Sequence, residues 1–272
     1  MVASLPRMVD WNAGRYETTA AIELAPVADI VVQAAGIAAD ESVIDVATGT
    51  GNAALAAARR GAPVRAIDGA PRLLAVAAQR ARAEGVDLDL REGDLLALPV
   101  SEASADVVVS VFGVIFAADP TSALREIRRA LRPTGRVLVS AWVPEGPIDA
   151  MLGAVGAIVA RITNSRPAPA FAWNDPAALG PVAAQIGLNL QATTAHELPI
   201  RAESAEAYVD LNQDHPMAVA VLPVLRRAGA EDELRAAQLS VLREANEDPD
   251  GFLVHSPYVV HRLSAAPAPG RH

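Results

Sequence analysis

The chain has 272 residues, a net charge of −9 and no cysteine, and all 23 of its basic residues are arginines. The absence of cysteine excludes disulfides, zinc–thiolate centres and a thiol nucleophile, and the absence of lysine excludes Schiff-base chemistry and a P-loop lysine. The acidic balance argues against a nucleic-acid substrate, because enzymes that act on nucleic acids carry a basic footprint.

No signal peptide or membrane span is expected. The longest apolar runs, Val107–Ala118 and Met151–Ala160, are shorter than the roughly 20 residues that cross a bilayer. We therefore expect a cytoplasmic protein with neither a membrane partner nor a nucleic-acid partner.

In chain order, two helices are expected first, at 16–24 and 26–35, with Gly36 ending the second. Strands and helices then alternate from residue 42 to residue 142, which is typical of a doubly wound α/β sheet. The expected strands are 42–46, 64–67, 88–91, 106–111 and 136–142, and the helices between them are 51–60, 71–84 and 121–131. The strand at 106–111 is the clearest, because a β-branched run suits burial on both faces of a parallel sheet.

After Trp142 the pattern changes to longer helices. Helices are expected at 146–161, 176–186, 205–225 and 231–246, strands at 188–198 and 252–263, and a loop at 164–175. The chain is thus predicted to divide into N-terminal helices (1–40), a sheet core (41–145), substrate-side helices with final antiparallel strands (146–264) and a disordered tail (265–272).

The loop from Ala47 to Gly51 follows the first strand of the sheet and carries the main functional signal. Gly49 and Gly51 have no Cβ atom, so the backbone can turn tightly there and a ligand can approach it. The helix that follows offers free N–H groups and the positive end of its dipole. Asp45, just before the loop, adds a negative charge that suits a ligand with an ammonium or sulfonium group and opposes a pyrophosphate. A purely structural strand-to-helix turn is the alternative.

Two further carboxylates end neighbouring strands. Asp68 ends the second strand, where an acidic residue accepts the hydroxyls of a ribose. Because Pro71 follows, a helix N-cap is its alternative role. Asp94 ends the third strand, where a carboxylate can accept from an adenine amino group while Leu95 covers the ring. A loop aspartate without a ligand is the alternative there.

Several segments occur in the order and spacing of class I methyltransferases. Val43–Asn52 resembles their first motif, and Ala66–Gly69 and Glu92–Leu95 resemble the next two cofactor motifs. Together with Leu98-Pro99, Ala105–Val108, Leu124, Glu126 and Leu131–Gly135, they resemble the ubiquinone/menaquinone-biosynthesis-like branch of small-molecule methyltransferases. The ordered motifs cover residues 42–142. Ala47 stands where the family has its first motif glycine, and Thr134 stands in its Pro-Gly-Gly turn.

The resemblance implies a Rossmann-like methyltransferase fold: a doubly wound, mostly parallel seven-stranded sheet with N-terminal helices and a helical lid before the last strand. It also implies S-adenosylmethionine as cofactor. The residues it places at the cofactor are Asp45, Ala47, Gly49, Gly51, Asp68, Asp94 and Leu95, with Val111 and Phe112 beside the reacting methyl group. Trp11 and Tyr16 are expected either to close over the cofactor or to pack between helices.

Methyl transfer from a sulfonium depends mainly on positioning, and a general base is needed only when the acceptor keeps its proton. His215, beside Asp214, is the candidate base, and His196 and His255 are weaker candidates; for each of the three, a solvated or core role is favoured over a catalytic one. No metal is expected, because the histidines lack ligand spacing. The segment 205–246 is the expected substrate lid.

The favoured acceptor is a small, partly apolar metabolite. An arginine-only, alanine-rich chain is typical of GC-rich bacterial genomes, which associates the chain with secondary metabolism. Homo-oligomer formation is left open. Two alternatives also stay open. One is an NAD-dependent oxidoreductase, because Gly49–Ala54 fits G-x-G-x-x-A. The other is a methyltransferase-fold protein that acts as a cyclase or a binding module without transfer.

Overall fold

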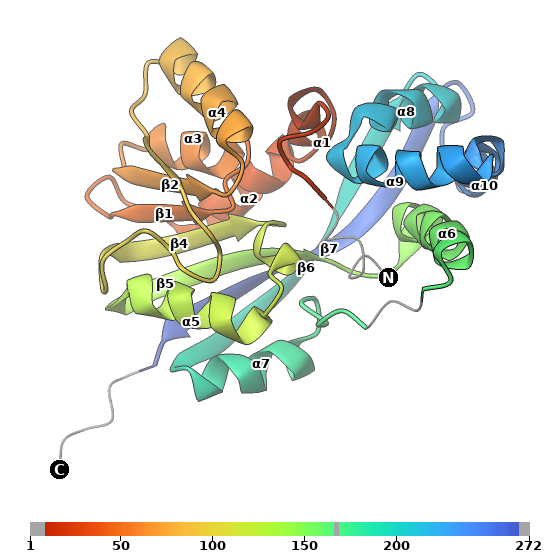
Figure 1. The fold of residues 1–272 in the computed structure, drawn as a ribbon. Helices are drawn as coiled ribbons and strands as arrows, with labels where there is room; N and C mark the ends of the chain where they lie inside the picture. The colour runs from red at the N-terminus through yellow and green to blue at the C-terminus, as the bar shows by residue number, and fades with distance from the viewer. Residues whose placement is uncertain (1–8, 166–168, 267–272) are drawn as a thin grey trace. The chain divides into compact units, whose positions relative to one another are not determined.

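The computed structural model describes residues 9–165 and 169–266, so the end of the expected tail lies outside the described residues. Seven strands form one sheet in the order β3-β2-β1-β4-β5-β7-β6 (Figure 1). The strands are β1 (Val43–Val46), β2 (Val64–Asp68), β3 (Asp89–Glu92), β4 (Ala105–Val111), β5 (Leu131–Trp142), β6 (Leu188–Ala202) and β7 (Phe252–Ala265). The pairs β1–β2, β1–β4, β2–β3 and β4–β5 are parallel. The predicted mostly parallel seven-stranded sheet is confirmed.

Helices alternate with most of the strands along the chain, and α2 to α5 belong to the same compact unit as β1 to β4 (Figure 1). They are α1 (Ala20–Glu23), α2 (Ala25–Ala35), α3 (Asn52–Ala58), α4 (Pro71–Glu84), α5 (Pro120–Ala130), α6 (Gly146–Thr163), α7 (Pro176–Gln185), α8 (Ala205–Leu211), α9 (Pro216–Ala228) and α10 (Glu231–Glu244). Short 3-10 turns are η3 (Tyr16–Thr18), η4 (Val114–Phe116) and η5 (Asn212–Asp214).

The carboxyl ends of β1 and β4 lie where the strand order reverses. Both strands are deeply buried: β1 is buried along its whole length, and Val107, Val108 and Val109 of β4 have no exposed surface. Asp45 pairs with Ala66 on one side and with Val109 on the other. Ligands of doubly wound sheets bind beyond the strand ends at such a reversal, so the loops after β1 and β4 are the expected ligand site.

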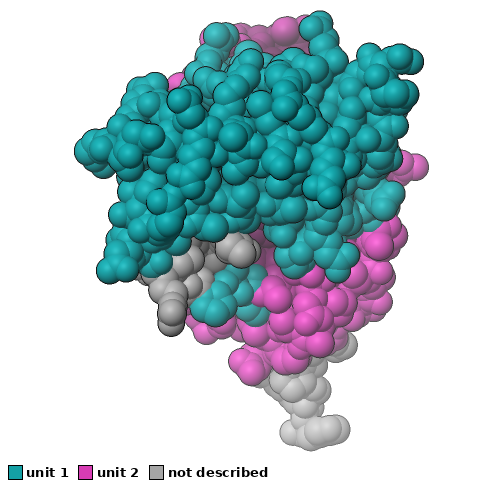
Figure 2. Space-filling view, turned by 90° about the vertical axis from the view of Figure 1, so that its right-hand side faces the viewer, with its two compact units in different colours: residues 1–23, 142–171, 196–258 teal, residues 24–141, 172–195, 259–272 magenta. Residues whose placement is uncertain are grey.

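The chain divides into two compact units, which are coloured separately in Figure 2. The first unit comprises residues 1–23, 142–171 and 196–258, and its helices are α1, α6, α8, α9 and α10. The second unit comprises residues 24–141, 172–195 and 259–272, and it holds β1 to β4 with helices α2 to α5 and α7. The two N-terminal helices therefore belong to different units.

The helix expected at 16–24 is interrupted, so that prediction was wrong in part. The structure has the 3-10 turn η3 and then the single-turn helix α1. The hydroxyls of Thr18 and Thr19 both donate to the carbonyl oxygen of Arg15. Such local side-chain bonds compete with a regular helix, which explains the break.

The helix expected at 205–225 is also two helices, α8 and α9, separated by η5. Pro216 is the cause. The residue before a proline is held out of the helical region, and His215 has φ −65° and ψ 137°. Pro216 itself lies in the first turn of α9, where its missing N–H costs nothing.

β5 begins at Leu131, before the expected Arg136. Leu131 pairs with Ala105 and Arg136 pairs with Val107, so the residues between them form an irregularity in the strand. Gly135 fits there because a Cβ atom would lie 2.6 Å from Leu131 Cδ1. The Pro-Thr-Gly turn therefore belongs to the strand and not to a separate loop.

Among the helices in the described ranges, α6 alone is long and apolar enough to cross a membrane, with a mean hydropathy of 1.3 over 18 residues. It is longer than the apolar run expected from the sequence. Val155, Ile158 and Val159 of α6 pack with Val221 and Leu225 of α9 in one apolar cluster. This packing involves one side of the helix, since 22% of the apolar stretch is buried.

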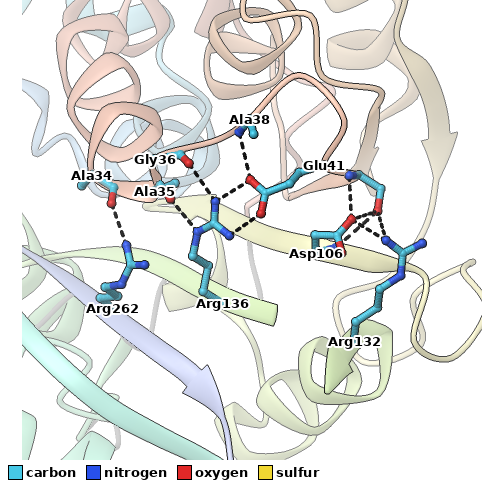
Figure 3. A network of polar contacts seen from close by, with 10 residues as sticks. Ala34, Ala35, Gly36, Ala38, Glu41, Asp106, Arg132, Arg136 and Arg262 are labelled. Atoms are coloured by element: carbon cyan, nitrogen blue, oxygen red, sulfur yellow. Dashed lines mark hydrogen bonds and ion pairs between the residues drawn. The ribbon is translucent and has the colours of Figure 1, made fainter. Parts of the chain in front are cut away.

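Arginines secure the amino ends of the strands in a polar network shown in Figure 3. Arg136 donates to both oxygens of Glu41, at 2.7 Å each, and to the carbonyl oxygens of Ala35 and Gly36 at the end of α2. Arg136 therefore donates to two carbonyl groups that have no partner within α2. Its guanidinium also places a positive charge at the negative end of the α2 dipole.

Removing the Arg136 guanidinium should destabilise the second unit. We expect Arg136→Met to lower the free energy of unfolding by about 2 kcal/mol, because Glu41 and two carbonyls lose their donor in a half-buried place. Arg59→Met is the control: Arg59 pairs with Glu84 in a more exposed position, so its loss should cost under about 1 kcal/mol. Urea unfolding of both variants measures the difference, and equal losses would contradict the assignment.

Candidate functional site

The loop after β1 turns back sharply through three residues with positive φ. They are Ala47 (φ 56°), Gly49 (φ 56°) and Gly51 (φ 84°). Glycine adopts this region without strain, whereas an alanine there is strained. Gly51 also approaches α4 closely, since a Cβ atom on it would lie 3.1 Å from Ala77 Cβ. The sequence-predicted glycines thus have the conformational role expected of them.

Gly113 makes room for the methyl group of Ala47. A Cβ atom at Gly113 would lie 2.4 Å from Ala47 Cβ and 3.0 Å from the Ala47 carbonyl oxygen. Two atoms cannot approach that closely, so an alanine at position 47 requires a glycine at position 113. Ala47 replaces the first glycine of the family's motif, and Gly113 in the turn after β4 compensates for the added methyl group.

Asp45 lies behind the loop and is only 1% exposed. Its Oδ2 accepts hydrogen bonds from Thr48 Oγ1 at 2.6 Å and from the Ala54 N–H at 2.9 Å. Burial raises the pKa of Asp45 to about 7, and the nearby Asp68 carboxylate also raises it. The carboxyl group therefore joins β1, the loop and the first turn of α3.

Asp68 ends β2 and is 8% exposed. Its Oδ2 accepts from the Gly49 N–H at 2.7 Å, and its Oδ1 accepts from the Ala70 N–H at 2.8 Å. Burial raises the pKa of Asp68, while these N–H donors act in the opposite direction. The N-cap position of α4 is Ala70, so Asp68 is not the cap residue itself. It joins the end of β2 to the glycine loop instead.

Asp94 and Leu95 follow β3, as the sequence predicts. The Asp94 side chain is exposed, and its Oδ1 accepts from the Leu96 N–H at 2.8 Å. Leu95 is half-buried. This is the geometry of a turn aspartate, and the exposed carboxylate is accessible to a ligand as well. The structure is compatible with both roles that the sequence suggests for Asp94, an acceptor for an adenine amino group and a loop aspartate without a ligand.

The end of β4 is strained at Phe112, which has φ 53° and is 4% exposed. Its N–H donates to Ser140 Oγ at 3.0 Å. Positive φ is unusual for a bulky side chain and occurs mainly at functional sites. Val111, just before it, is half-buried. The predicted pair thus lies at the strand end beside the loop, because β4 is the neighbour of β1.

Sequence reasoning missed two residues that hold this arrangement. Ser110 has no exposed surface; its Oγ donates to the Val46 carbonyl oxygen at 2.8 Å and accepts from the Val114 N–H at 3.0 Å. Arg80 on α4 donates to the carbonyl oxygen and hydroxyl of Thr50 and to Asn52 Oδ1. A polar residue in an apolar strand was the available signal for Ser110. Nothing in the local sequence distinguishes Arg80.

Trp11, Tyr16 and His215 lie in the first unit and contact one another there. Their ring centroids are 5.9 Å (Trp11–Tyr16), 6.2 Å (Trp11–His215) and 5.9 Å (Tyr16–His215) apart. The Arg15 N–H donates to the Asp214 carbonyl oxygen at 2.7 Å. The N-terminal segment is therefore fixed to the junction between α8 and α9.

His215 caps α9: its Nδ1 accepts from the Met217 N–H at 3.2 Å. Burial lowers the pKa of His215 to about 4, so the ring is neutral at pH 7. With Nδ1 accepting, Nε2 carries the proton and is a donor. This tautomer disfavours the predicted role of His215 as a general base.

The weaker histidine candidates have other partners. His196 stacks on Tyr258 with centroids 5.2 Å apart, and His255 Nδ1 lies 3.0 Å from Glu247. Within residues 9–165 and 169–266, no three His, Asp or Glu side chains form a group that could hold a metal ion.

Comparison with known proteins identifies the family of this core. Residues 44–139 match the profile of a methyltransferase domain. An uncharacterized protein of Mycobacterium tuberculosis is 37% identical over 163 residues, which are 60% of this chain and 59% of that protein. The demethylmenaquinone methyltransferase of Thermus thermophilus is 41% identical over 108 residues, covering 39% of this chain and 49% of that enzyme. The chain thus spans well under two thirds of the curated relatives it matches.

The fold also matches a solved structure. The YcgJ protein of Bacillus subtilis is 18% identical, with a TM-score of 0.58 over 89% of this chain and 98% of the other. The predicted resemblance to the ubiquinone/menaquinone-like branch is confirmed by these sequence matches, and residues 44–139 are a methyltransferase domain, which implies S-adenosylmethionine as cofactor.

The contact between Ala47 and Gly113 predicts a strongly coupled pair. We expect Gly113→Ala to lower the free energy of unfolding by about 2–3 kcal/mol, because the new methyl group overlaps Ala47. Ala47→Gly should recover at least about 1 kcal/mol of that loss in the double variant, measured by a double-mutant cycle in urea. Gly180→Ala, whose Cβ would meet only Leu190 at 4.0 Å, is the control and should add independently to Ala47→Gly. Additive Gly113 and Ala47 effects would refute the contact.

The pKa of Asp45 predicts a pH dependence of stability. The folded protein holds this proton up to about pH 7, whereas the unfolded chain releases it near pH 4, so Asp45 makes stability fall as pH rises between those values. In Asp45→Asn this proton is no longer taken up on folding. The slope of the free energy of unfolding against pH should therefore become less negative by up to about 1.4 kcal/mol per pH unit. Urea unfolding at pH 5, 6, 7 and 8 measures the slopes, with Asp40→Asn, an exposed carboxylate, as control. An unchanged slope in Asp45→Asn would exclude this assignment.

Proposed function

Because residues 44–139 carry a class I, S-adenosylmethionine-dependent methyltransferase domain, we propose that the whole chain transfers the methyl group of this cofactor to a small, partly apolar metabolite. The observation that supports this most is that the neighbouring strands β1, β2 and β3 each have a carboxylate at or just after their carboxyl end, namely Asp45, Asp68 and Asp94. Asp45 and Asp68 also bond to the positive-φ loop. The cofactor's cationic groups, ribose hydroxyls and adenine amine are partners for such carboxylates.

The residues present fit the cofactor. Asp68 has two carboxylate oxygens at the loop to accept ribose hydroxyls, and Asp94 is exposed to accept from the adenine amine beside Leu95. The Asp68 carboxylate, which accepts from the Gly49 N–H, places negative charge at the loop and opposes a pyrophosphate there. Asp45, whose pKa burial raises to about 7, adds to this charge only above that pH. The same potential disfavours the NAD-dependent alternative.

When bound, S-adenosylmethionine supplies an activated methyl group. The chain's own part is to position the reactants: β1 and β4 place the loop and the Val111–Phe112 turn at one edge of the sheet. The closure of Trp11 and Tyr16 over the cofactor stays a prediction. The role of residues 205–246 as a lid over the methyl acceptor also stays a prediction. His215, as an Nε2–H donor, suits hydrogen bonding to an acceptor better than proton removal.

Cofactor binding tests the proposal by titration calorimetry. We expect S-adenosylhomocysteine to bind with micromolar affinity and NAD not to bind. Asp94→Asn should weaken S-adenosylhomocysteine about tenfold, which corresponds to about 1.4 kcal/mol for one charged hydrogen bond. Asp87→Asn, an exposed carboxylate before β3 and outside the cofactor motifs, is the matched control and should bind normally. NAD binding without S-adenosylhomocysteine binding would establish the oxidoreductase.

Transfer must be measured separately, because binding alone also fits a cyclase or a binding module. A labelled-methyl assay against apolar amines, phenols and carboxylic acids should show transfer to one of these classes. Cofactor binding with no transfer to any class would favour the non-transferring alternative. The cytoplasmic location and the bacterial secondary-metabolic role are part of this proposal, and the oligomeric state is left open.

A further inference from the structure

Arg80 on α4 holds the second half of the loop after β1 and the first residue of α3. Its Nη1 atom donates to the Thr50 carbonyl oxygen at 2.8 Å, to Thr50 Oγ1 at 3.1 Å and to Asn52 Oδ1 at 2.7 Å. The carboxylates at the ends of β1 and β2 bond to the first half of the loop, at Thr48 and Gly49. The loop, these carboxylates and α4 all belong to the second unit.

The bond from Arg80 fixes the peptide group that joins Thr50 to Gly51. The carbonyl oxygen of this group accepts from Arg80, and its N–H donates to the Thr48 carbonyl oxygen at 2.9 Å. Gly51 has φ 84° and no Cβ atom, so steric restriction of its backbone is weak. The orientation of the peptide group therefore depends on the hydrogen bonds at its two ends.

The same face of α4 also contacts the loop through Ala77, three residues before Arg80. A Cβ atom on Gly51 would lie 3.1 Å from Ala77 Cβ, so α4 and the loop are in close contact at this point. Ala77 is buried and Arg80 is half-buried. Residues three apart in a helix lie side by side. Ala77 thus sets the distance between α4 and the loop, and Arg80 sets the orientation of the loop's backbone.

The position of Arg80 is a costly one for a cation. Within the described ranges Arg80 forms no salt bridge, and Glu84, one turn further along α4, pairs with Arg59 at 2.7 Å. Burial lowers the pKa of Arg80, while the Glu84 charge acts in the opposite direction. The guanidinium also lies beside the first residue of α3, at the positive end of that helix's dipole. These costs offset the gain from its hydrogen bonds, so we expect the net contribution of Arg80 to folding stability to be small.

We propose that Arg80 is a positioning residue for the cofactor, which holds the loop in the conformation that binds S-adenosylmethionine. The inference rests on the proposed function and adds to it a residue outside the segments that resemble the cofactor motifs. Arg80 acts through Thr50 and Asn52 and not by contact with the cofactor. A loop that is ordered before binding loses less conformational entropy when the ligand arrives, so the affinity for the ligand is higher.

Titration calorimetry with S-adenosylhomocysteine on the full chain tests the proposal. Arg80→Met keeps an unbranched apolar side chain and removes the donors, so it should weaken binding about tenfold. Arg82→Met is the matched control, because Arg82 is an exposed arginine on the same helix, and its affinity should stay within about twofold. In both variants the midpoint of urea unfolding should stay within about 0.5 M of that of the unaltered protein.

Arg80→Lys separates the hydrogen bonds from a general packing effect. A single nitrogen makes all three bonds of Arg80, and the ammonium group of lysine carries three donors. Lysine should therefore recover part of the lost affinity and bring it to within about threefold of the unaltered protein.

Amide hydrogen exchange at Gly51, measured by NMR, reports on the loop alone. In Arg80→Met the Gly51 N–H should exchange at least about fivefold faster, because the peptide group has lost the bond at its carbonyl end. Arg82→Met should leave this exchange rate unchanged.

Unchanged affinity or unchanged Gly51 exchange in Arg80→Met would overturn the inference. An affinity loss that lysine does not reduce, or one that comes with a large fall in the urea midpoint, would also overturn it, since Arg80 would then act only through folding. Failure of the unaltered protein to bind S-adenosylhomocysteine would count against the proposed function, and the Gly51 exchange rates would still show whether Arg80 holds the loop.

Discussion

Two buried carboxylates hold the loop after β1, and the rest of the site depends on them. Asp45 accepts from Thr48 and from the first turn of α3, and Asp68 accepts from the Gly49 N–H. The loop is thereby tied to β1, β2 and α3 together. These bonds offset the strain of the positive φ at Ala47 and hold the turns at Gly49 and Gly51 in place. Asp68 also places a carboxylate at the loop, so one residue has both a structural and an electrostatic role.

The turn after β4 completes that arrangement by shape. Ala47 keeps a methyl group where strain would favour glycine, and Gly113 leaves the space that this methyl group occupies. Ser110 joins the end of β1 to the same turn through its hydroxyl, and Ser140 receives the N–H of the strained Phe112. Two loops far apart in the chain thus behave as one packed structure. A change in one is transmitted to the other through contact, which is the usual behaviour of close-packed interiors.

The first unit is organised around packed aromatic rings and a helix cap. Its aromatic rings at Trp11, Tyr16 and His215 are packed against one another. The Nδ1 atom of His215 caps α9 by accepting a hydrogen bond from its first turn. A histidine used in this way is a poor proton acceptor.

The sequence by itself determined the core of the fold. Buried β-branched runs, glycines and ordered motifs predicted the strands of residues 42–142 and located Asp45, Asp68 and Asp94 at strand ends, because period and turn chemistry are local properties. Only the tertiary structure decided what these groups contact: that Asp68 accepts from the Gly49 N–H, that Gly113 accommodates Ala47, and that Arg80 supports the loop from α4. Such pairings join residues far apart in the chain, and no local pattern encodes which distant side chains meet. The breaks at Thr18–Thr19 and Pro216 lie between these cases, since their cause is local but its outcome depends on which competing hydrogen bonds the packing allows.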